Sequence, residues 1–438
     1  MVVQRGIAIS LRLWRWVNPW LKINGWFKCH ATKCFDSGDI VMSARLDVFL
    51  PLPLTNRGPS YTCGMIAKGM ASDELAVTVV TPRTRRLSVH PARVIQALPY
   101  WARYVPYRWV RSISTSRIHS AFSSQVKAAP SQTRAAYIWP DASIGAIKEL
   151  KRANVRIFRE MINCHRGTAK GILDEEYMRL GVAPGHTITE ASVAAEQEAL
   201  EAVDYVFCPS LIVEHSLLEN GLAASKIISA SYGWDPARIH GSSRLLEPCD
   251  GLTVVFAGTI CVRKGCHLLL EYWSKSKVRG RLVLAGAMEA TIKEKCAALL
   301  ARDDVVVLEF VSDIGALYRS ADVFAFPSLE EGAPLVIYEA CGGGLPILTT
   351  PMGVGRIVRH GQEGFVLDPF DEKGWIEGIQ LLAEDKKRRI DMSAAAVERS
   401  QLFRWDMVAE RRKKQVLQRL FDNGPVSDSI AEYADVAI

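Results

Sequence analysis

Short, nearly continuous apolar runs alternate along the chain with longer segments in which apolar positions recur at helical spacing. Apolar runs bounded by turn residues are typical of strands buried on both faces, and their alternation with helices predicts a doubly wound α/β fold with a parallel sheet. In the first half of the chain, the predicted strands are Leu46–Pro53, Ala76–Thr81, Ala135–Trp139, Val155–Ile162, Tyr205–Ser210 and Ile227–Ala230.

A second series of the same kind follows a turn rich in Gly, Asp and Pro at Ser231–Pro236. This turn predicts a domain boundary, with one Rossmann-like domain over residues 42–235 and another over 236–400. A final basic helix is expected at Met407–Phe421, inside a C-terminal segment 401–438. The predicted strands of the second domain are Leu252–Ala257, Arg281–Ala285, Val305–Phe310, Val323–Phe326 and, as the last, Pro346–Thr349.

Residues 1–41 do not continue this pattern. They combine four tryptophans with basic residues, and their apolar stretch is too interrupted for a secretory signal. Two interpretations stay open: a basic, tryptophan-bearing amphipathic helix at a membrane surface, or a poorly ordered extension before a natural start at Met42. We favour the extension, because compositional signals of this kind are weak.

The segment Phe326–Leu345, FPSLEEGAPLVIYEACGGGL, carries the strongest candidate chemistry. Its strand stops at Pro327 and Pro334 opens an apolar helical stretch, so the loop between them can aim backbone N–H groups and a positive helix end at a phosphate. Glu331 stands in the loop and Glu339 on the helix, so the two acids can reach separate parts of one ligand. A nucleotide sugar has two such parts, the sugar and the ribose, joined by a diphosphate.

Two further strand ends are candidate ligand sites. Gly258 ends a predicted strand, and Arg263 and Lys264 stand between it and the next helix. Arg can fork onto two phosphate oxygens and Lys adds a compact charge, so the pair at this position predicts a diphosphate site. In the first domain, His165 follows the carboxyl end of a strand, where ligands bind in such sheets. It can contact a sugar or phosphate, or equally serve as a structural hydrogen-bond partner.

The segment Tyr100–Arg111, YWARYVPYRWVR, interleaves aromatic residues with arginines. Nucleic-acid binding would use them for stacking and phosphate contact, and a lipid-facing or acceptor-facing surface would use them as well. The third interpretation is an amphipathic helix whose aromatic residues pack in the core, which is what aromatic stripes usually do. No nucleic-acid recognition motif accompanies the segment, which counts against the first interpretation.

Composition narrows the class of protein. Apolar residues make up 49% of the 438 residues and charged residues 23%, which indicates a globular chain long enough for two full cores. The net charge of +7 suits anionic ligands or an anionic membrane surface. No apolar run is long enough for a transmembrane helix. The ten cysteines show no zinc spacing, so free thiols in the cytoplasm, and no metal, are expected.

Taken together, these residues resemble the retaining glycosyltransferases of family 4, whose GT-B fold sets two Rossmann-like domains face to face across a cleft. Glu331 and Glu339 stand like the E-x7-E pair of that family, and Gly258 with the basic pair resembles its glycine and two cations. The stretch Gly353–Asp368 resembles the family's closing segment after the last strand. The resemblance runs from about Met42 to Trp405 and is densest in the second half.

The resemblance implies a role for each candidate residue. Arg263 and Lys264 would bind the donor diphosphate and stabilise the leaving nucleotide, while Glu331 would contact the donor sugar. Glu339 would hold the ribose, and His165 would approach the sugar from the first domain. Three glycines would shape the donor-binding loops: Gly58, Gly258 and Gly332.

The implied activity is metal-independent transfer, with retention, from a UDP- or GDP-sugar to a saccharide or lipid-linked acceptor in polysaccharide or glycoconjugate synthesis. The resemblance implies no cofactor. It also implies peripheral contact with the inner membrane surface. Two departures from the family bear on donor binding: Pro334 lacks an N–H, and the loop at Gly58 has one glycine instead of two.

Two other functions stay open. A non-catalytic GT-B scaffold would bind a nucleotide sugar or glycan without transfer, although the presence of both acids and both cations favours the enzyme. A nucleic-acid-binding protein would use Tyr100–Arg111. A sugar phosphorylase would need a pyridoxal lysine site, for which the sequence offers no candidate.

Overall fold

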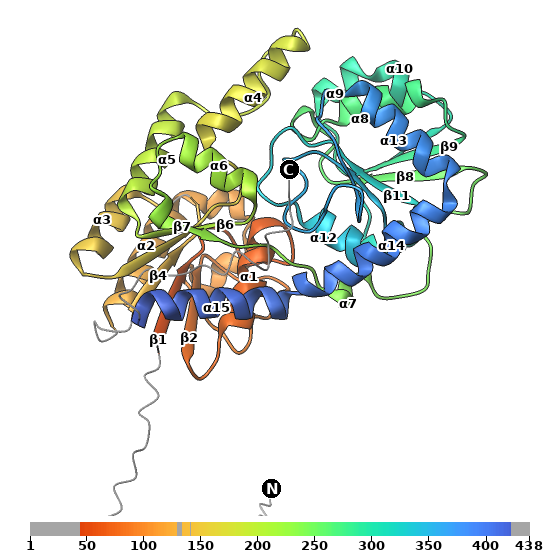
Figure 1. The fold of residues 1–438 in the computed structure, drawn as a ribbon. Coiled ribbons are helices and arrows are strands. Elements are labelled where there is room, and N and C mark those ends of the chain that lie inside the picture. Colours follow the sequence, from red (N-terminus) through yellow and green to blue (C-terminus); the bar gives the residue numbers. More distant parts are fainter. Residues whose placement is uncertain (1–43, 129–133, 141, 422–438) are drawn as a thin grey trace, which may run out of the picture. The chain divides into compact units, whose positions relative to one another are not determined.

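The computed structural model describes residues 44–128, 134–140 and 142–421, so the predictions for residues 1–41 and for the end of the C-terminal segment lie outside the described residues. The described chain builds two parallel sheets (Figure 1). The first has seven strands in the order β3-β2-β1-β4-β5-β6-β7, and the second has six in the order β10-β9-β8-β11-β12-β13. Helices connect most consecutive strands, as the alternating pattern predicts, whereas β2 leads to β3 and β12 leads to β13 through loops.

In the first sheet the strands are β1 Ala44–Phe49, β2 Leu75–Thr81, β3 Arg93–Gln96, β4 Arg134–Ile138, β5 Arg156–Glu160, β6 Tyr205–Cys208 and β7 Ile227–Ser229. Its helices are α1 Gly58–Met70, η1 Tyr100–Tyr104, α2 Tyr107–Lys127, α3 Ile144–Arg152, α4 Arg166–Arg179, α5 Glu190–Ala202, α6 Leu211–Glu219 and η3 Ala224–Lys226.

In the second sheet the strands are β8 Leu252–Ala257, β9 Gly280–Ala285, β10 Val305–Leu308, β11 Val323–Phe326, β12 Ile347–Thr349 and β13 Gly364–Val366. The remaining helices are α7 Pro236–Ile239, η4 Val262–Lys264, α8 Cys266–Ser276, α9 Ala290–Lys295, α10 Ala297–Leu300, α11 Ile314–Arg319, α12 Leu335–Gly342, α13 Glu372–Glu384, α14 Lys386–Ser400, η5 Gln401–Phe403 and α15 Trp405–Phe421.

The sequence prediction missed one edge strand in each sheet. Strand β3 has no buried residue. Strand β13 is short, lies in the segment after β12 for which no strand was predicted, and pairs with β12. Edge strands bury less surface than central ones, so they lack the apolar run that reveals β8 or β11, both buried along their whole length.

The carboxyl ends of the parallel strands place three loops that matter for function. Strand β11 pairs directly with β8, so the loop after β11 and the short helix η4 after β8 leave the sheet side by side. The loop after β5 leads into α4. Ligands bind at such strand ends in open α/β sheets.

Helix α15 packs on α1, the helix that connects β1 to β2 of the first sheet (Figure 1). The two helices approach closely, because a Cβ atom at Gly69 would stand 2.4 Å from that of Ala409. Arg412 reaches from α15 into the core, where its guanidinium donates to both carboxylate oxygens of Glu160 at 2.8 and 3.1 Å. Both side chains are almost fully buried, so the basic side of this helix is only partly solvated.

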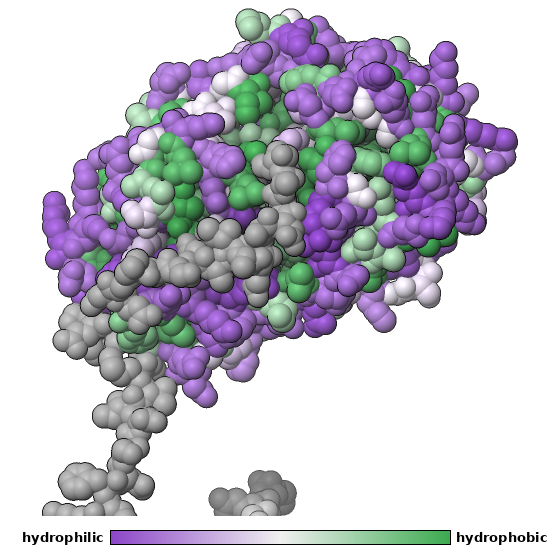
Figure 2. All heavy atoms as spheres, viewed as in Figure 1, coloured by the Kyte–Doolittle hydropathy of each residue, from purple (hydrophilic) through white to green (hydrophobic). Residues whose placement is uncertain are grey.

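The aromatic residues of Tyr100–Arg111 do not form the core stripe that was the third sequence interpretation. Four of them are well exposed: Tyr100, Trp101, Tyr104 and Trp109. The buried stripe of α2 is instead made by Val110, Ser114, Ile118, Phe122 and Val126. Elsewhere, on the face drawn in Figure 2, hydrophilic residues cover most of the surface and apolar ones form small patches between them.

Candidate functional site

The loop between β11 and α12 is fixed against η4 by backbone contacts. The amide of Leu329 donates to the carbonyl of Arg263 at 2.9 Å, and the hydroxyl of Ser328 lies 3.4 Å from the same carbonyl. Within the loop, the Ser328 hydroxyl also donates to the carbonyl of Glu330 at 3.1 Å. Gly265 follows η4 in a left-handed conformation, with φ of 66°. A Cβ there would stand 2.0 Å from the carbonyl oxygen of Pro327, so glycine permits this close approach.

This approach brings the two predicted cations to the first predicted acid. Arg263 Nη1 lies 3.1 Å from Glu331 Oε1, and Lys264 Nζ lies 3.0 Å from the same oxygen. Arg263 Nη1 also lies 3.1 Å from Glu330 Oε2. We call these four residues, Arg263, Lys264, Glu330 and Glu331, the ion cluster. Gly258 lies beside the ion cluster, because a Cβ there would stand 3.2 Å from Lys264 Nζ.

The pKa values of the two adjacent acids, Glu330 and Glu331, are shifted in opposite directions. Burial disfavours the charge on Glu331, but Lys264 and Arg263 outweigh it and the pKa of Glu331 falls below its ordinary value. Burial raises the pKa of Glu330, and Arg263 offsets that only in part while the neighbouring Glu331 adds to it. The cluster therefore favours the ionised form of Glu331 and makes ionisation of Glu330 less favourable than that of an exposed glutamate.

This difference gives a pH prediction. A carboxylate with a lowered folded-state pKa contributes stability above its unfolded value of about 4.5 and loses that contribution as the pH falls through the folded value. The free energy of unfolding of Glu331→Gln should therefore lie below that of the wild type near pH 6, and the gap should close on acidification. Urea denaturation between pH 6.5 and 3.5 tests this prediction. The range extends about two pH units above the unfolded pKa and about one unit below it. A gap of constant size would contradict the ion pairing.

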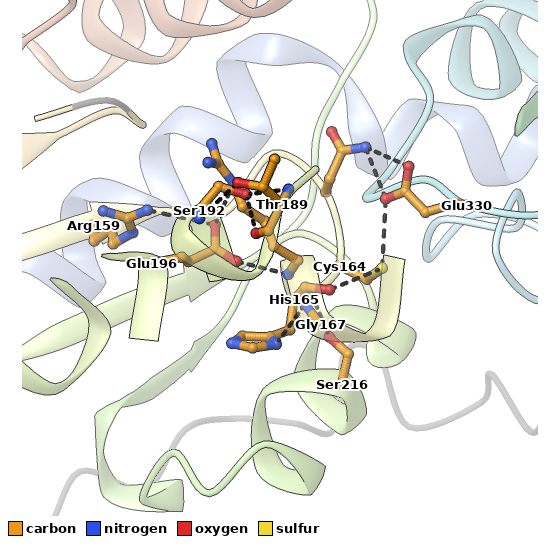
Figure 3. A network of polar contacts seen from close by, with 11 residues as sticks. Arg159, Cys164, His165, Gly167, Thr189, Ser192, Glu196, Ser216 and Glu330 are labelled. Atoms are coloured by element: carbon orange, nitrogen blue, oxygen red, sulfur yellow. Dashed lines mark hydrogen bonds and ion pairs between the residues drawn. The ribbon is translucent and has the colours of Figure 1, made fainter. Parts of the chain in front are cut away.

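Glu330 links the ion cluster to the loop after β5 (Figure 3). Asn163 Nδ2 donates to both carboxylate oxygens at 2.8 Å, and the Cys164 thiol lies 3.4 Å from Oε1. Gly332 meets the same loop, since a Cβ there would stand 2.3 Å from the carbonyl oxygen of Ile162. Glu330 was not among the predicted site residues, although it stands next to Glu331.

The close approach at Gly332 predicts that Gly332→Ala destabilises the protein by about 1–3 kcal/mol, because the new methyl group must displace a backbone carbonyl. Urea denaturation measures the change. The control is Gly171→Ala inside α4, where a Cβ meets nothing within 4 Å and the substitution should be neutral or stabilising. Equal stability of the Gly332 variant and the wild type would disprove the contact.

His165 caps α4 rather than joining the ion cluster. Its Nδ1 accepts from the Gly167 amide at 3.1 Å, and its own amide donates to the Ser216 hydroxyl at 3.0 Å. The side chain is buried, and burial lowers its pKa while Glu196 opposes that effect. This hydrogen bond is of the structural kind that was one of the two sequence interpretations, and contact of His165 with a sugar or phosphate stays a prediction.

The neighbours of His165 form a second polar group in Figure 3. Glu196, on α5, accepts from the Arg166 amide at 2.7 Å and lies 3.4 Å from Arg166 Nε. A pocket of about 220 Å³ adjoins this group and the ion cluster. Its polar lining residues include Asn163, Arg166, Thr187, Ser192, Glu196 and Glu330, and its apolar ones include Pro140, Ile162 and Ile188. Glu196 gave no sequence signal, because it stands in an ordinary helical pattern.

The second predicted acid, Glu339, pairs with Arg238 and with no cation of the ion cluster among the described residues. Its Oε1 lies 3.2 Å from Arg238 Nε, and the Arg238 guanidinium lies 4.5 Å above the Tyr61 ring. Burial raises the pKa of Glu339, and Arg238 opposes the shift. Sequence reasoning missed Arg238, which stands two residues after the turn assigned as the domain boundary. Gly58 begins α1 in a left-handed conformation, and a Cβ there would meet nothing within 4 Å.

The described residues contain no group of three or more His, Cys, Asp or Glu side chains arranged to hold a metal ion. In the same part of the chain, no helix has the length and hydropathy that crossing a bilayer requires.

Residues 242–399 match the family model of the glycosyl transferases group 1. A D-inositol 3-phosphate glycosyltransferase of Corynebacterium aurimucosum is 28% identical over 245 residues, which cover 50% of this chain and 58% of that protein. An uncharacterized glycosyltransferase of Haemophilus influenzae is 26% identical over 187 residues, or 41% and 52% of the two chains. The chain thus spans about half the length of the curated relatives it matches.

Two solved structures show the fold. Sucrose-phosphate synthase of Thermosynechococcus elongatus superposes with a TM-score of 0.66 at 17% identity, covering 87% of this chain and all of that one. The HepE protein of Anabaena, in complex with UDP and glucose, superposes with a TM-score of 0.60 at 16% identity, covering 86% of this chain and all of that one. The predicted GT-B architecture is confirmed.

Proposed function

We propose that this protein is a glycosyltransferase, because residues 242–399 match the family model of the glycosyl transferases group 1 and the chain has the GT-B fold. It moves a sugar from a nucleotide-sugar donor to a hydroxyl of a saccharide or lipid-linked acceptor in glycan or glycoconjugate synthesis. The observation that carries this proposal is the ion cluster, in which two cations and an ionised carboxylate meet at the carboxyl ends of β8 and β11.

The donor diphosphate would replace Glu331 as the partner of the two cations. As the bond to the sugar breaks, negative charge grows on the departing diphosphate, and Arg263 and Lys264 are already positioned to stabilise it. Released from the cations, Glu331 would turn to the hydroxyls of the donor sugar. No metal ion is needed in this scheme, so excess chelator should leave activity unchanged.

The ribose would bind at Glu339. Arg238 contacts one of its oxygens at 3.2 Å, and a carboxylate can accept several hydrogen bonds, so the ribose hydroxyls can share this side chain. The acceptor hydroxyl would enter through the pocket beside Glu330, which is of a size that suits a single sugar ring. We propose transfer with retention, in which the departing phosphate oxygen takes the acceptor's proton and no protein nucleophile is used.

A panel of UDP-, GDP- and ADP-sugars tests the proposal. We expect nucleotide release from one donor, stimulated by acceptor, and a product whose anomeric configuration by NMR equals that of the donor. An inverted product would contradict retention alone, whereas no interaction with any donor would contradict the whole assignment.

A non-catalytic scaffold is the second candidate. It is favoured by the complete pairing of both cations with carboxylates and by Pro334, which caps α12 without an N–H to offer a phosphate. Tight donor binding with no release, even with saccharide and lipid acceptors present, would support the scaffold over the enzyme.

A further inference from the structure

Helix α4 of the first domain contacts η4, the short helix of the second domain that carries both cations of the ion cluster. Two adjacent residues near the carboxyl end of α4 reach across to that domain. Glu176 Oε1 lies 2.5 Å from His267 Nε2 at the start of α8, and the Tyr177 hydroxyl donates to Glu289 Oε1 at 2.5 Å. The side chains of Glu176, Tyr177 and His267 are all buried, so this contact is closely packed.

Glu289, in the loop after β9, connects α4 to the backbone of η4. Its Oε1 accepts from the Tyr177 hydroxyl, and its Oε2 accepts from the backbone amide of Val262 at 2.9 Å. Val262 is the first residue of η4, and Arg263 and Lys264 are the other two. A side chain of the first domain therefore reaches the cation-bearing backbone through a single carboxylate.

The bond between Tyr177 and Glu289 is fixed on both sides. The Glu289 amide donates to the Ile260 carbonyl at 2.9 Å, and the Ile260 amide donates to the Ala287 carbonyl at 2.8 Å. In the loop after α4, a Cβ at Gly185 would stand 2.6 Å from the Tyr177 hydroxyl oxygen and 2.7 Å from Glu289 Oε1. In so enclosed a place, loss of the hydroxyl leaves the carboxylate oxygen without its donor.

Helix η4 depends on such outside contacts. It has three residues, and a 3-10 helix of this length makes few hydrogen bonds of its own. Its start is held by the bond from the Val262 amide to Glu289, and the Arg263 carbonyl accepts from the Leu329 amide. Movement of Glu289 would therefore shift the backbone on which both cations stand.

We propose that Tyr177 is a positioning residue for sugar transfer, which holds η4 through Glu289 so that Arg263 and Lys264 meet the donor diphosphate. Tyr177 contacts neither donor nor acceptor in this scheme. Because it belongs to the first domain, the two cations are fully aligned when α4 lies against η4. The catalytic consequence rests on the proposed function, whereas the link from Tyr177 to η4 does not.

Amide hydrogen exchange, followed by mass spectrometry on the full chain without ligand, tests the link. Tyr177→Phe keeps the ring and removes the hydroxyl, so the amides of residues 261–265 should exchange about 10-fold faster, as expected for the loss of one hydrogen bond to a carboxylate. The matched control is Tyr272→Phe, because both tyrosines are 3% exposed and the Tyr272 hydroxyl donates to the Pro369 carbonyl at 2.9 Å. The control should leave exchange at η4 unchanged. Equal exchange by Tyr177→Phe and the wild type would overturn the proposal.

Initial rates of transfer test the catalytic consequence. Tyr177→Phe should lower kcat about 10-fold, and Glu289→Ala at least as much. The double variant Tyr177→Phe/Glu289→Ala should be no slower than Glu289→Ala, because both side chains act through the same amide. Losses that multiply in the double variant, or an unchanged kcat beside faster exchange, would overturn the positioning role. Absence of transfer by the wild type would contradict the proposed function, while the exchange result supports or overturns the link to η4 in either case.

Discussion

Replacing Arg412 by methionine is expected to lower the free energy of unfolding by about 3–5 kcal/mol. The substitution removes the cation that pairs with Glu160 in the core of the first domain and leaves that carboxylate buried. Tyr137 and the Ser231 carbonyl lose the same guanidinium as a donor. Burial lowers the pKa of Arg412, but Glu160 outweighs that effect and the pKa is raised, so the guanidinium stays protonated.

Urea denaturation measures this loss, with Lys414→Ala as the control. Lys414 stands two residues further along the same helix and is exposed, so its removal should change stability by less than about 0.5 kcal/mol. The double variant Glu160→Gln/Arg412→Met removes both charges and should recover part of the loss. A loss below about 1 kcal/mol for the single variant would show that α15 does not depend on this pair.

The second large effect is on transfer. Arg263→Ala should reduce kcat by about 100- to 1000-fold, equal to roughly 2.7–4 kcal/mol of transition-state stabilisation. The Arg263 guanidinium contacts both acids of the ion cluster. Burial lowers its pKa, but Glu331 and Glu330 outweigh that effect and the pKa is raised. Initial rates of nucleotide release at saturating donor give the comparison.

Arg279→Ala is the matched control for this prediction. It removes an arginine of the same domain whose side chain is 78% exposed and pairs only at the surface with Asp250, so kcat should not change. Because Arg263 also donates to the Glu330 carbonyl at 2.9 Å, its loss could disturb the loop. A rate that falls in parallel with stability, and recovers when the protein is stabilised, would contradict a role in the transition state.

The sequence predicted most of the fold because the buried strands are continuous apolar runs. It also predicted that Arg263, Lys264 and Glu331 would serve one site, and the structure brings them together since β8 and β11 are neighbours in the sheet. The edge strands β3 and β13 escaped notice, because a short strand with exposed side chains carries no such run.

The contacts that sequence reasoning missed join segments far apart in the chain. Asn163 and Glu330 are separated by 167 positions, and only the packed structure shows that they bond. Arg238 reaches Glu339 in the same way, from a short helix after a turn. The aromatic residues near Trp109 show a different limit of sequence reasoning. Helical spacing predicts a helix there, but it does not indicate which face of α2 packs in the core and which face is exposed.

A transfer assay with a donor labelled in its sugar tests the central claim most directly. With the donor that the protein accepts and a saccharide or lipid-linked acceptor, we expect one labelled sugar on the acceptor for each nucleotide released. Labelled donor recovered intact, bound to the protein with no label on any acceptor, would contradict a glycosyltransferase and leave a binding scaffold in its place.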